Sequence, residues 1–598
     1  MNKKAMIALM GLAAAGMAGA ATVDVTADIE TSTKWVSTNV YNLTKQIYVR
    51  PGATLTIEAG TRVESTANVG GSLAVSRGAR IYVNGTKDAP VVMTSSNDDG
   101  TARVACNEWG NLTLMGKGLI AASSDLSRNR PGNTKTPTGL NTVQMEGLVA
   151  DGTNDVVYGG ADDNDDSGSI SYLSLRYGGK VIGLGNELNG LSLGGIGRET
   201  DINHVEIFNN VDDGIEIWGG AVNLKYVNIW NIGDDSFDID QGWRGKAQFG
   251  LIVQGYSATA KQGSGYGDNC FEHDGAENSD ASPVTSGKIA NFTVVGQPKV
   301  SGYKNGDGAT TWRDNARIQY ANMIFMDIGE EIVRLDGIDG DGAQGYSLAL
   351  TGVAPEIDGE GDLTATGKAQ EEAAFVPLWS TPYNTYYETN FVDDVYSYAE
   401  MYQAQTSGYL CEIRNSVMFR NADDSGDLAD TVGVYSPAMN NTVASSNDMP
   451  IANLTRGIPA TFTVGEDNYI VLPVASIDPR AANDATDVGA GVEGDDFFTS
   501  VNYAGGFSPN YNWLEGWTAV DEFGLTDVSA NTNAPTSDLA IGAVVSFQSE
   551  QGVLYGVERA AAAGGPYSEV ASISGDGSYK TYVDDELSTA AFYRVVVK

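Results

Sequence analysis

The chain has 598 residues, with 77 acidic and 36 basic side chains and a net charge of −41. Such an acidic excess repels phosphate backbones, so we expect no nucleic-acid partner, whereas divalent cations are favoured. The 73 glycines and 17 prolines indicate many turns, and the composition as a whole excludes a coiled coil and a largely disordered chain.

The N-terminus has the pattern of an export signal. Lys3 and Lys4 precede the apolar stretch Ala5–Met17, and residues 18–20 read Ala-Gly-Ala, which is typical of a cleavage site. We therefore predict that residues 1–20 are a Sec signal peptide and that the protein is secreted, extracellular or at the cell surface. The apolar stretch is too short to span a bilayer, and we expect no transmembrane segment in the mature chain.

Short strands with a long repeat follow. Val49–Glu58 and Val75–Asn84 each contain a Gly-Ala turn between alternating apolar residues, and the two turns are 26 residues apart. His204–Asn209 returns 22 residues later as Tyr226–Asn231. A period of this length with several strands in it predicts one rung of a parallel β-helix, because each rung stacks on its neighbour.

The repeat also predicts the register of the stack. Asn209 should lie over Asn231 as an asparagine ladder at a turn. Trp218 should face outward, either stacking on a sugar ring or covering a neighbouring loop, and Trp513 and Trp517 are expected to close the C-terminal end of the core. The apolar pairs expected inside are Val205/Val227, Ile207/Ile229, Ile215/Phe237 and Ile217/Ile239.

The periodicity fades between residues 352 and 497, which we interpret as loop-rich, irregular rungs of a β-helix domain spanning residues 21–530. Residues 530–537 are a predicted linker. Five alternating runs then predict a small antiparallel β-sandwich over residues 538–598, at residues 543–548, 553–559, 567–573, 580–583 and 591–597.

Several stretches carry a family resemblance: Gly185–Gly195, Asn210–Glu216, Gly233–Asp238, Gly245–Gly250, Tyr503–Phe507 and Trp513–Ala519. Together they resemble secreted right-handed parallel β-helix surface proteins of the Bacteroidetes and of the Planctomycetes–Verrucomicrobia group. Ala591–Val595 is similar to the end of fibronectin III-like modules. The resemblance implies an all-β chain, a pectate-lyase-like solenoid followed by a fibronectin III-like β-sandwich, and it carries no established activity.

The repeat is rich in carboxylates. Six acidic residues recur at rung spacing: Asp212, Asp213, Glu216, Asp234, Asp235 and Asp238. In this register Glu216, Asp238 and Glu272 form one outward row, in which neighbouring charges repel. Three interpretations stay open: turn aspartates that accept backbone N–H bonds, a Ca²⁺ site, or catalysis.

The number and spacing of the cysteines and histidines limit which metals the chain could bind. Cys106, Cys270 and Cys411 lie far apart, so they form no disulfide framework and no zinc pair. The chain has two histidines, His204 and His273, which excludes a histidine-rich site. A metal here is therefore expected to be a hard cation held by oxygen, with Ca²⁺ as the expected cofactor and no other.

The catalytic alternative rests on a second resemblance. Asp213, Asp234 and Asp235 are similar to the carboxylate trio of polygalacturonases, which are also β-helices, and His273 and Arg317 follow in the same order. That resemblance implies an inverting hydrolysis by carboxylic acid and base. The family's Gly-His-Gly reads Glu-His-Asp here and its Arg-Ile-Lys reads Arg-Ile-Gln, and the predicted register turns His273 inward.

Two function hypotheses follow. The favoured one is a noncatalytic secreted or cell-surface protein of structural or adhesive function, whose acidic β-helix binds Ca²⁺ and extracellular glycans or other cell-surface components. The alternative is a polysaccharide hydrolase or lyase of the polygalacturonase-like β-helix type.

Overall fold

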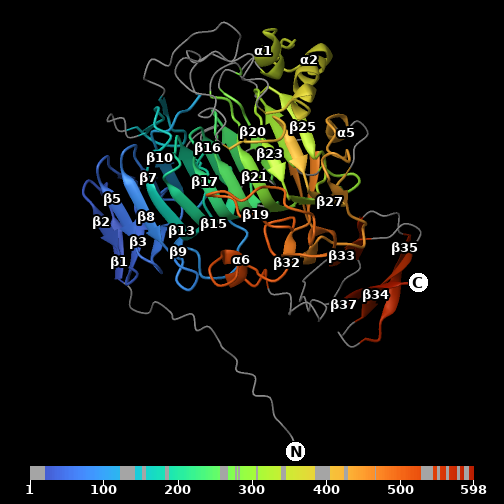
Figure 1. The fold of residues 1–598 in the computed structure, drawn as a ribbon. Coiled ribbons are helices and arrows are strands. Elements are labelled where there is room, and N and C mark those ends of the chain that lie inside the picture. The colour runs from blue at the N-terminus through green and yellow to red at the C-terminus, as the bar shows by residue number, and fades with distance from the viewer. Residues whose placement is uncertain are drawn as a thin grey trace, which may run out of the picture.

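A computed structural model gives the fold (Figure 1). The predicted signal peptide and the predicted linker lie outside the residues that the structure describes. The described residues are 21–121, 142–150, 156–181, 187–255, 267–276, 279, 283–304, 308–338, 345–383, 404–422, 428–464, 467–526, 543–548, 553–560, 565–574, 579–584 and 592–598.

One face of the molecule is a nine-stranded parallel sheet whose strands stack in chain order. Each strand is short, so one chain segment crosses this face once per rung. Its members are β4 (Gln46–Val49), β7 (Ser72–Val75), β10 (Leu112–Met115), β14 (Leu191–Gly194), β16 (Ile215–Trp218), β18 (Phe237–Asp240), β20 (Phe271–His273), β22 (Thr310–Arg313) and β25 (Val333–Gly337).

A 17-stranded sheet forms the rest of the solenoid wall. Its first rungs use two short strands each, which merge into long bent strands in the middle and separate again at the end. The strands are β1 (Ala21–Val25), β2 (Thr33–Trp35), β3 (Asn39–Leu43), β5 (Thr54–Ile57), β6 (Arg62–Ser65), β8 (Arg80–Asn84), β9 (Val91–Ser95), β13 (Gly168–Arg176), β15 (Asp201–Asn210), β17 (Asn223–Ile232), β19 (Lys246–Val253), β21 (Lys288–Val295), β23 (Gln319–Ala321), β24 (Ile324–Met326), β26 (Glu412–Arg414), β27 (Val417–Phe419) and β28 (Thr442–Val443).

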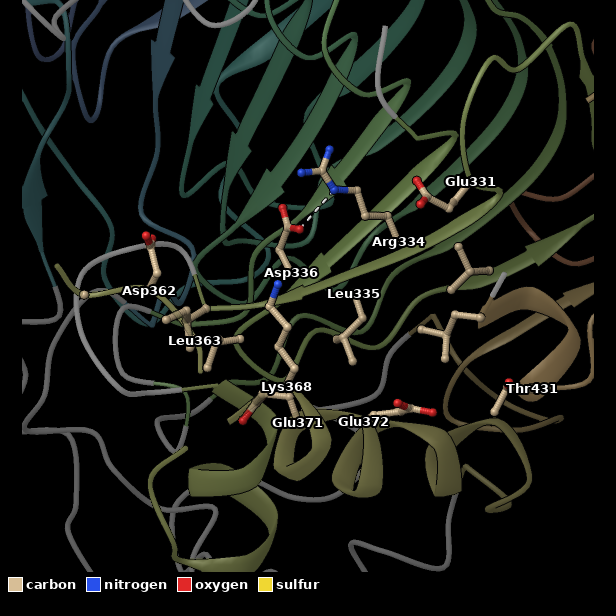
Figure 2. Close-up of a pocket in the computed structure, with 14 residues that line it drawn as sticks. Glu331, Arg334, Leu335, Asp336, Asp362, Leu363, Lys368, Glu371, Glu372 and Thr431 are labelled. Atoms are coloured by element: carbon tan, nitrogen blue, oxygen red, sulfur yellow. Dashed lines mark hydrogen bonds and ion pairs between the residues drawn. The ribbon is translucent and has the colours of Figure 1, made fainter. Parts of the chain in front are cut away.

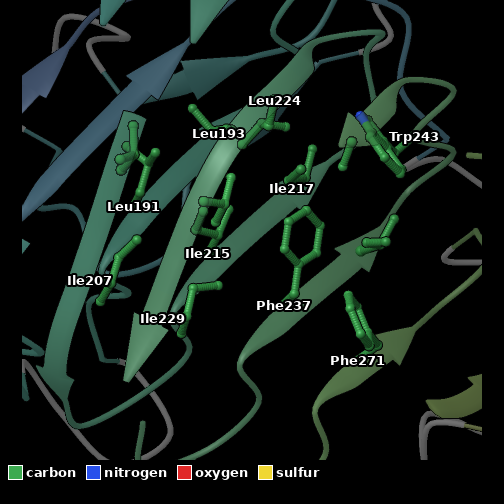
Figure 3. Packing of buried hydrophobic residues seen from close by; sticks show 14 of the residues in the cluster. Leu191, Leu193, Ile207, Ile215, Ile217, Leu224, Ile229, Phe237, Trp243 and Phe271 are labelled. Atoms are coloured by element: carbon green, nitrogen blue, oxygen red, sulfur yellow. The ribbon is translucent and has the colours of Figure 1, made fainter. Parts of the chain in front are cut away.

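The predicted register is confirmed. Val205 pairs with Val227 and Ile207 with Ile229 on β15 and β17, and all the partners are parallel. The pairs Ile215/Phe237 and Ile217/Ile239 follow on β16 and β18, and all eight side chains are buried. All eight belong to one core, and Figure 3 shows Ile207 and Ile229 of one sheet packed with Ile215, Ile217 and Phe237 of the other. The all-β parallel β-helix expected from the sequence is therefore the observed fold.

Asparagines shape one of the turns. Asn209 and Asn231 have φ of 59° and 55°, the left-handed region that asparagine tolerates better than most residues. Their side chains form the predicted ladder, in which Asn231 Nδ2 donates to Asn209 Oδ1 at 3.0 Å. The side-chain amide thus links neighbouring rungs where the strands end.

A second left-handed position, within the long strands, carries an aromatic ladder that the sequence did not reveal. Tyr172, His204, Tyr226 and Phe249 have φ between 50° and 63°. Their rings stack, with centroids 4.1 Å apart for Tyr172 and His204 and 4.3 Å apart for His204 and Tyr226. The bend at each of these residues turns the chain from one face of the solenoid to the next.

This ladder corrects the prediction for the two late tryptophans. Trp513 and Trp517 do not close the end of the core; their rings lie edge-on against Tyr226 and Tyr172, at 5.6 Å and 5.5 Å between centroids. The segment that carries them returns to the flank of the middle rungs. Its short helix α6 (Ala519–Glu522) is held there by Glu206, which accepts the amide N–H groups of residues 519 and 520.

Helices cover the C-terminal end of the core instead. The rings of Phe375 and Trp379 pack on Trp312 of the last rungs, with centroids 5.7 Å and 5.3 Å away. They belong to α2 (Ala365–Phe375) and η2 (Val376–Trp379), which pack with α1 (Gly345–Thr351) beyond β25 (Figure 1). α5 (Leu428–Thr431) lies beside them.

Parallel pairing runs from Ala21 to Val443, so the later part of the predicted 21–530 domain has another structure. It contains the antiparallel pairs β29 (Ile451–Arg456) with β32 (Val474–Ala481) and β30 (Ala460–Val464) with β31 (Asp467–Val471). The turn η3 (Asn483–Ala485) follows. A small pair, β11 (Val143–Gln144) and β12 (Val157–Tyr158), lies in an earlier loop.

The described residues of the tail contain the five predicted strands. β33 pairs with β36, and β34 pairs with both β35 and β37, all antiparallel. Their bounds are β33 (Ala543–Gln548), β34 (Leu554–Ala560), β35 (Ser568–Ser574), β36 (Tyr579–Asp584) and β37 (Phe592–Val597). Within the described parts of the chain, no helix has the length and apolar character needed to cross a membrane.

Candidate metal centre

The acidic row lies on the outer face of the nine-stranded sheet. Glu216, Asp238 and Glu272 are register partners on β16, β18 and β20, at positions that alternate with the buried core residues. Strand geometry explains this placement, because successive side chains point to opposite faces. The apolar repeat and the acidic repeat are therefore two sides of the same strands.

The turn before these strands adds two more stacked pairs. Asp235 N–H donates to Asp213 Oδ1 at 2.9 Å, and Asn269 N–H donates to Asp235 Oδ1 at 2.6 Å. Each of these aspartates thus binds the backbone of the next rung, as the turn interpretation requires. The second pair consists of Asp212 and Asp234, which directly precede Asp213 and Asp235 in the sequence.

Two groups of carboxylates converge closely enough to share a cation. Within each group, one oxygen from every member lies within 4.8 Å of the others. The first group is Asp212, Asp213 and Asp234, and the second is Asp213, Glu216 and Asp238. Asp213 belongs to both, so the two groups form one continuous cluster that contains five of the six predicted ligands. Asp235 adjoins it through its bond to Asp213.

Burial makes the charged form of these carboxylates energetically unfavourable. Asp213 and Glu216 are each 8% exposed and Asp238 is 5% exposed. Burial raises the pKa of Asp213 and Glu216 well above the usual range, and the adjacent Asp212 and Asp238 carboxylates raise these two pKa values further. Burial and then a neighbouring carboxylate likewise raise the pKa values of Asp212, Asp235, Asp238 and Glu272.

An arginine lies at one end of the row. Arg313 on β22 forms ion pairs with Glu272 at 2.9 Å and with Asp274 at 3.7 Å. Burial alone would lower the pKa of Arg313, but Glu272 and Asp274 raise it, so the guanidinium stays charged. Arg313 is not among the site residues predicted from the sequence, although its place in the strand Thr-Thr-Trp-Arg puts it on the outer face.

Three other residues near the cluster were missed. Asn189 Nδ2 donates to Glu216 Oε2, and Asn189 Oδ1 accepts the amide N–H of Asp213 at 3.2 Å. Glu146 lies near Glu216, and burial followed by the Glu187 carboxylate raises its pKa. Glu187 and Asn189 lie in Gly185–Gly195, one of the stretches that carry the family resemblance, and this was the one signal in the sequence that pointed to them.

The structure separates the other residues of the catalytic alternative from this cluster. His273 is fully buried inside the solenoid, where Nδ1 contacts the carbonyl of Thr311 at 2.6 Å and Nε2 contacts the hydroxyl of Tyr320. Burial lowers its pKa to about 3 although the Thr311 carbonyl opposes the shift. Arg317 is also buried, and its Nη2 donates to Asn315 Oδ1 at 2.7 Å.

Trp218 faces outward, but it is covered. Its side chain is 6% exposed and packs with Met115, Ile120 and Tyr158, so it covers the neighbouring loop as one of the two interpretations predicted. All three cysteines are buried.

Comparison with known proteins gives one match. Residues 27–353 match the family model described as a pectate-lyase-like beta helix domain. This range contains the nine-stranded sheet and the whole carboxylate cluster. No curated protein and no solved structure matches the chain.

Proposed function

The chain belongs to the pectate-lyase-like β-helix family, and we propose that it is a secreted or cell-surface protein of structural or adhesive function whose carboxylate cluster binds Ca²⁺. The observation that supports this proposal is the convergence of five carboxylates in two groups that share Asp213: Asp212, Asp213 and Asp234, and Asp213, Glu216 and Asp238. Asp235 completes the set of six.

Turn formation alone does not explain the cluster. The hydrogen bonds to the next rung account for Asp213 and Asp235. They do not require Glu216 opposite Asp238, where two carboxylates meet at about the 4.8 Å spacing of neighbouring strands. At that distance two charges repel by about 1 kcal/mol in water and by more when partly buried.

A calcium ion would offset this repulsion with the ligands that it prefers. Ca²⁺ takes about six to eight oxygens from carboxylates and backbone carbonyls, in flexible geometry. Stacked turns offer both kinds of ligand, because each rung brings its carboxylates and its carbonyl groups to the same edge. A bridging cation on the outer face would also give an anionic or hydroxyl-rich glycan a point of attachment.

Direct titration tests the metal. Isothermal calorimetry of Ca²⁺ into the chelator-treated protein should show saturable binding, which Asp212→Asn combined with Asp234→Asn should weaken strongly. The control variant is Asp358→Asn with Asp362→Asn, which removes the same charge from an exposed loop. Equal binding by both variants would contradict the assigned site. Glycan-array binding that requires Ca²⁺ would support the adhesive function.

The alternative function is that of a polysaccharide hydrolase or lyase, and it is supported by the position of Arg313 beside Glu272 and Asp274. A guanidinium group and carboxylates on one outer face are a combination that acid–base catalysis can use. Incubation with acidic and neutral polysaccharides should release neither reducing ends nor unsaturated products if the protein is noncatalytic. Product release that is lost in Arg313→Gln would replace the first proposal with this one.

A further inference from the structure

The nine-stranded sheet ends at β25, which pairs with β22 on one side. Along the sheet, the amide N–H of an inward-facing residue donates to the following rung, as from Phe237 to the carbonyl of Cys270 at 3.2 Å and from Phe271 to that of Ala309 at 3.0 Å. The equivalent positions on β25 are Val333 and Leu335. Their amide and carbonyl groups therefore point away from β22, and no described strand continues the sheet there.

A pocket of about 760 Å³ runs along this open edge. Glu331, Leu335 and Ile338 line one side of it, and side chains of α2 and α5 line the other. Figure 2 shows β25 crossing above α2, with Lys368 of the helix directed toward the strand, while the Glu371 carboxylate accepts the amide N–H groups of Tyr346 and Ser347. The helices therefore shield the edge without pairing with its backbone.

An extended peptide is the ligand whose chemistry fits an open strand edge. A strand added there would supply one donor and one acceptor to each free backbone position, and pockets beside the edge would take its alternate side chains. Leu335, Leu363 and Leu428 offer apolar contacts for one face of such a strand.

The charged side chains around the pocket indicate which residues the other face of the peptide carries. Glu331, Asp362 and Glu372 line the pocket with Lys368 as their basic neighbour, whereas Arg334 is paired with Asp336 at 3.0 Å. The site is thus acidic and complementary to lysine or arginine side chains. A second copy of this chain, with a charge of −41, would be repelled.

We propose that the β25 edge binds an extended peptide with alternating apolar and basic residues, which adds a tenth strand to the nine-stranded sheet. This site is distant in sequence from the Ca²⁺ ligands and does not depend on the proposed calcium function.

Backbone methylation of the peptide tests strand addition. The probe is a seven-residue peptide with blocked ends in which valine alternates with lysine, and its Kd is measured by calorimetry at physiological salt. Alternate amides of a strand face opposite edges, so N-methylation of one set should weaken binding by about tenfold or more while the other set is tolerated. Hydrogen exchange should show protection of residues 333–337 on binding. Equal effects of the two methylated sets, or no protection there, would overturn the proposal.

Charge variants test the chemistry of the site. Glu331→Gln with Glu372→Gln should weaken binding by about fivefold. The matched control is Glu356→Gln with Glu360→Gln, which removes two exposed carboxylates outside the pocket and should bind normally. Equal affinity of the two double variants would exclude the acidic pocket as the site. Self-association that the peptide abolishes would assign the edge to a second copy and overturn the proposed partner.

Discussion

Glu216 on β16 lies opposite Asp238 on β18, and a carboxylate oxygen of each lies within 4.8 Å of the other on the outer face of the sheet. Two carboxyl groups this close repel when both are charged, unless one of them holds a proton or a common cation binds both. The protonation of the pair depends on pH, and the proposed Ca²⁺ would favour the charged state, so pH and calcium can be varied independently to test the proposal.

Calcium should stabilise the folded protein. A ligand that binds only the folded state adds about 2.7 kcal/mol at about 100 times its Kd. Ca²⁺ should therefore raise the Tm and a chelator should lower it, and Asp234→Asn with Asp235→Asn should abolish the difference. Sodium chloride at matched ionic strength is the control: a shift of the same size with sodium would assign the effect to screening of the acidic surface.

The calcium-free protein should become less stable as pH rises. The pKa values of Asp213, Glu216 and Asp238 are raised in the folded state, so the folded state holds more protons than the unfolded state above about pH 4. Stability must then fall with increasing pH from that point up to the folded-state pKa values. Urea midpoints in the presence of a chelator should be lower at pH 8 than at pH 5, and saturating Ca²⁺ should reduce or reverse this difference. A higher midpoint at pH 8 without calcium would contradict the electrostatic account.

Neither histidine should titrate near neutral pH in the folded protein. Burial lowers the pKa of His273 to about 3, against the opposing Thr311 carbonyl, and that of His204 to about 4. Because the chain contains only these two histidines, labelled imidazole resonances should stay constant between pH 5.5 and 8, and both should titrate near pH 6.5 in urea. A native midpoint between 6 and 7 for His273 would revive the acid–base role that the polygalacturonase-like alternative requires.

Removal of the Phe237 ring from the core should strongly destabilise the folded protein. Phe237 is fully buried between the neighbouring rungs, with its ring 5.8 Å from that of Phe271. Phe237→Ala should lower the free energy of unfolding by about 3–5 kcal/mol. Val443→Ala, at a position 69% exposed, should change it by less than about 0.5 kcal/mol in the same denaturant titration. Similar losses in the two variants would contradict the assigned core.

The tail should be separable from the solenoid. Its five strands pair among themselves in two antiparallel sheets. Limited proteolysis should therefore cut near residues 531–537 and leave two stable fragments, identified by mass spectrometry. A chain that resists cleavage there, or a tail fragment that is degraded at once, would contradict an independent β-sandwich.

The 22-residue spacing was sufficient to predict the register, the core pairs and the asparagine ladder. Parallel rungs stack in register, so residues one period apart in sequence become neighbours in space, and Ile215 had to meet Phe237. The same periodicity placed Glu216, Asp238 and Glu272 in one row on the opposite face. The core pairs and the acidic row could therefore be predicted from sequence spacing alone.

Only the tertiary structure decided what covers the solenoid. Glu206 accepts the amide N–H of Ala519, 313 residues away, and this contact belongs to no repeat. Trp513 and Trp517 are expected at the open end, because they lie late in the sequence and a solenoid end needs a cap, but they pack on Tyr172 and Tyr226. The burial of the carboxylates was likewise decided by the fold, because the solvent exposure of an outward side chain depends on segments that pack over it from distant parts of the chain.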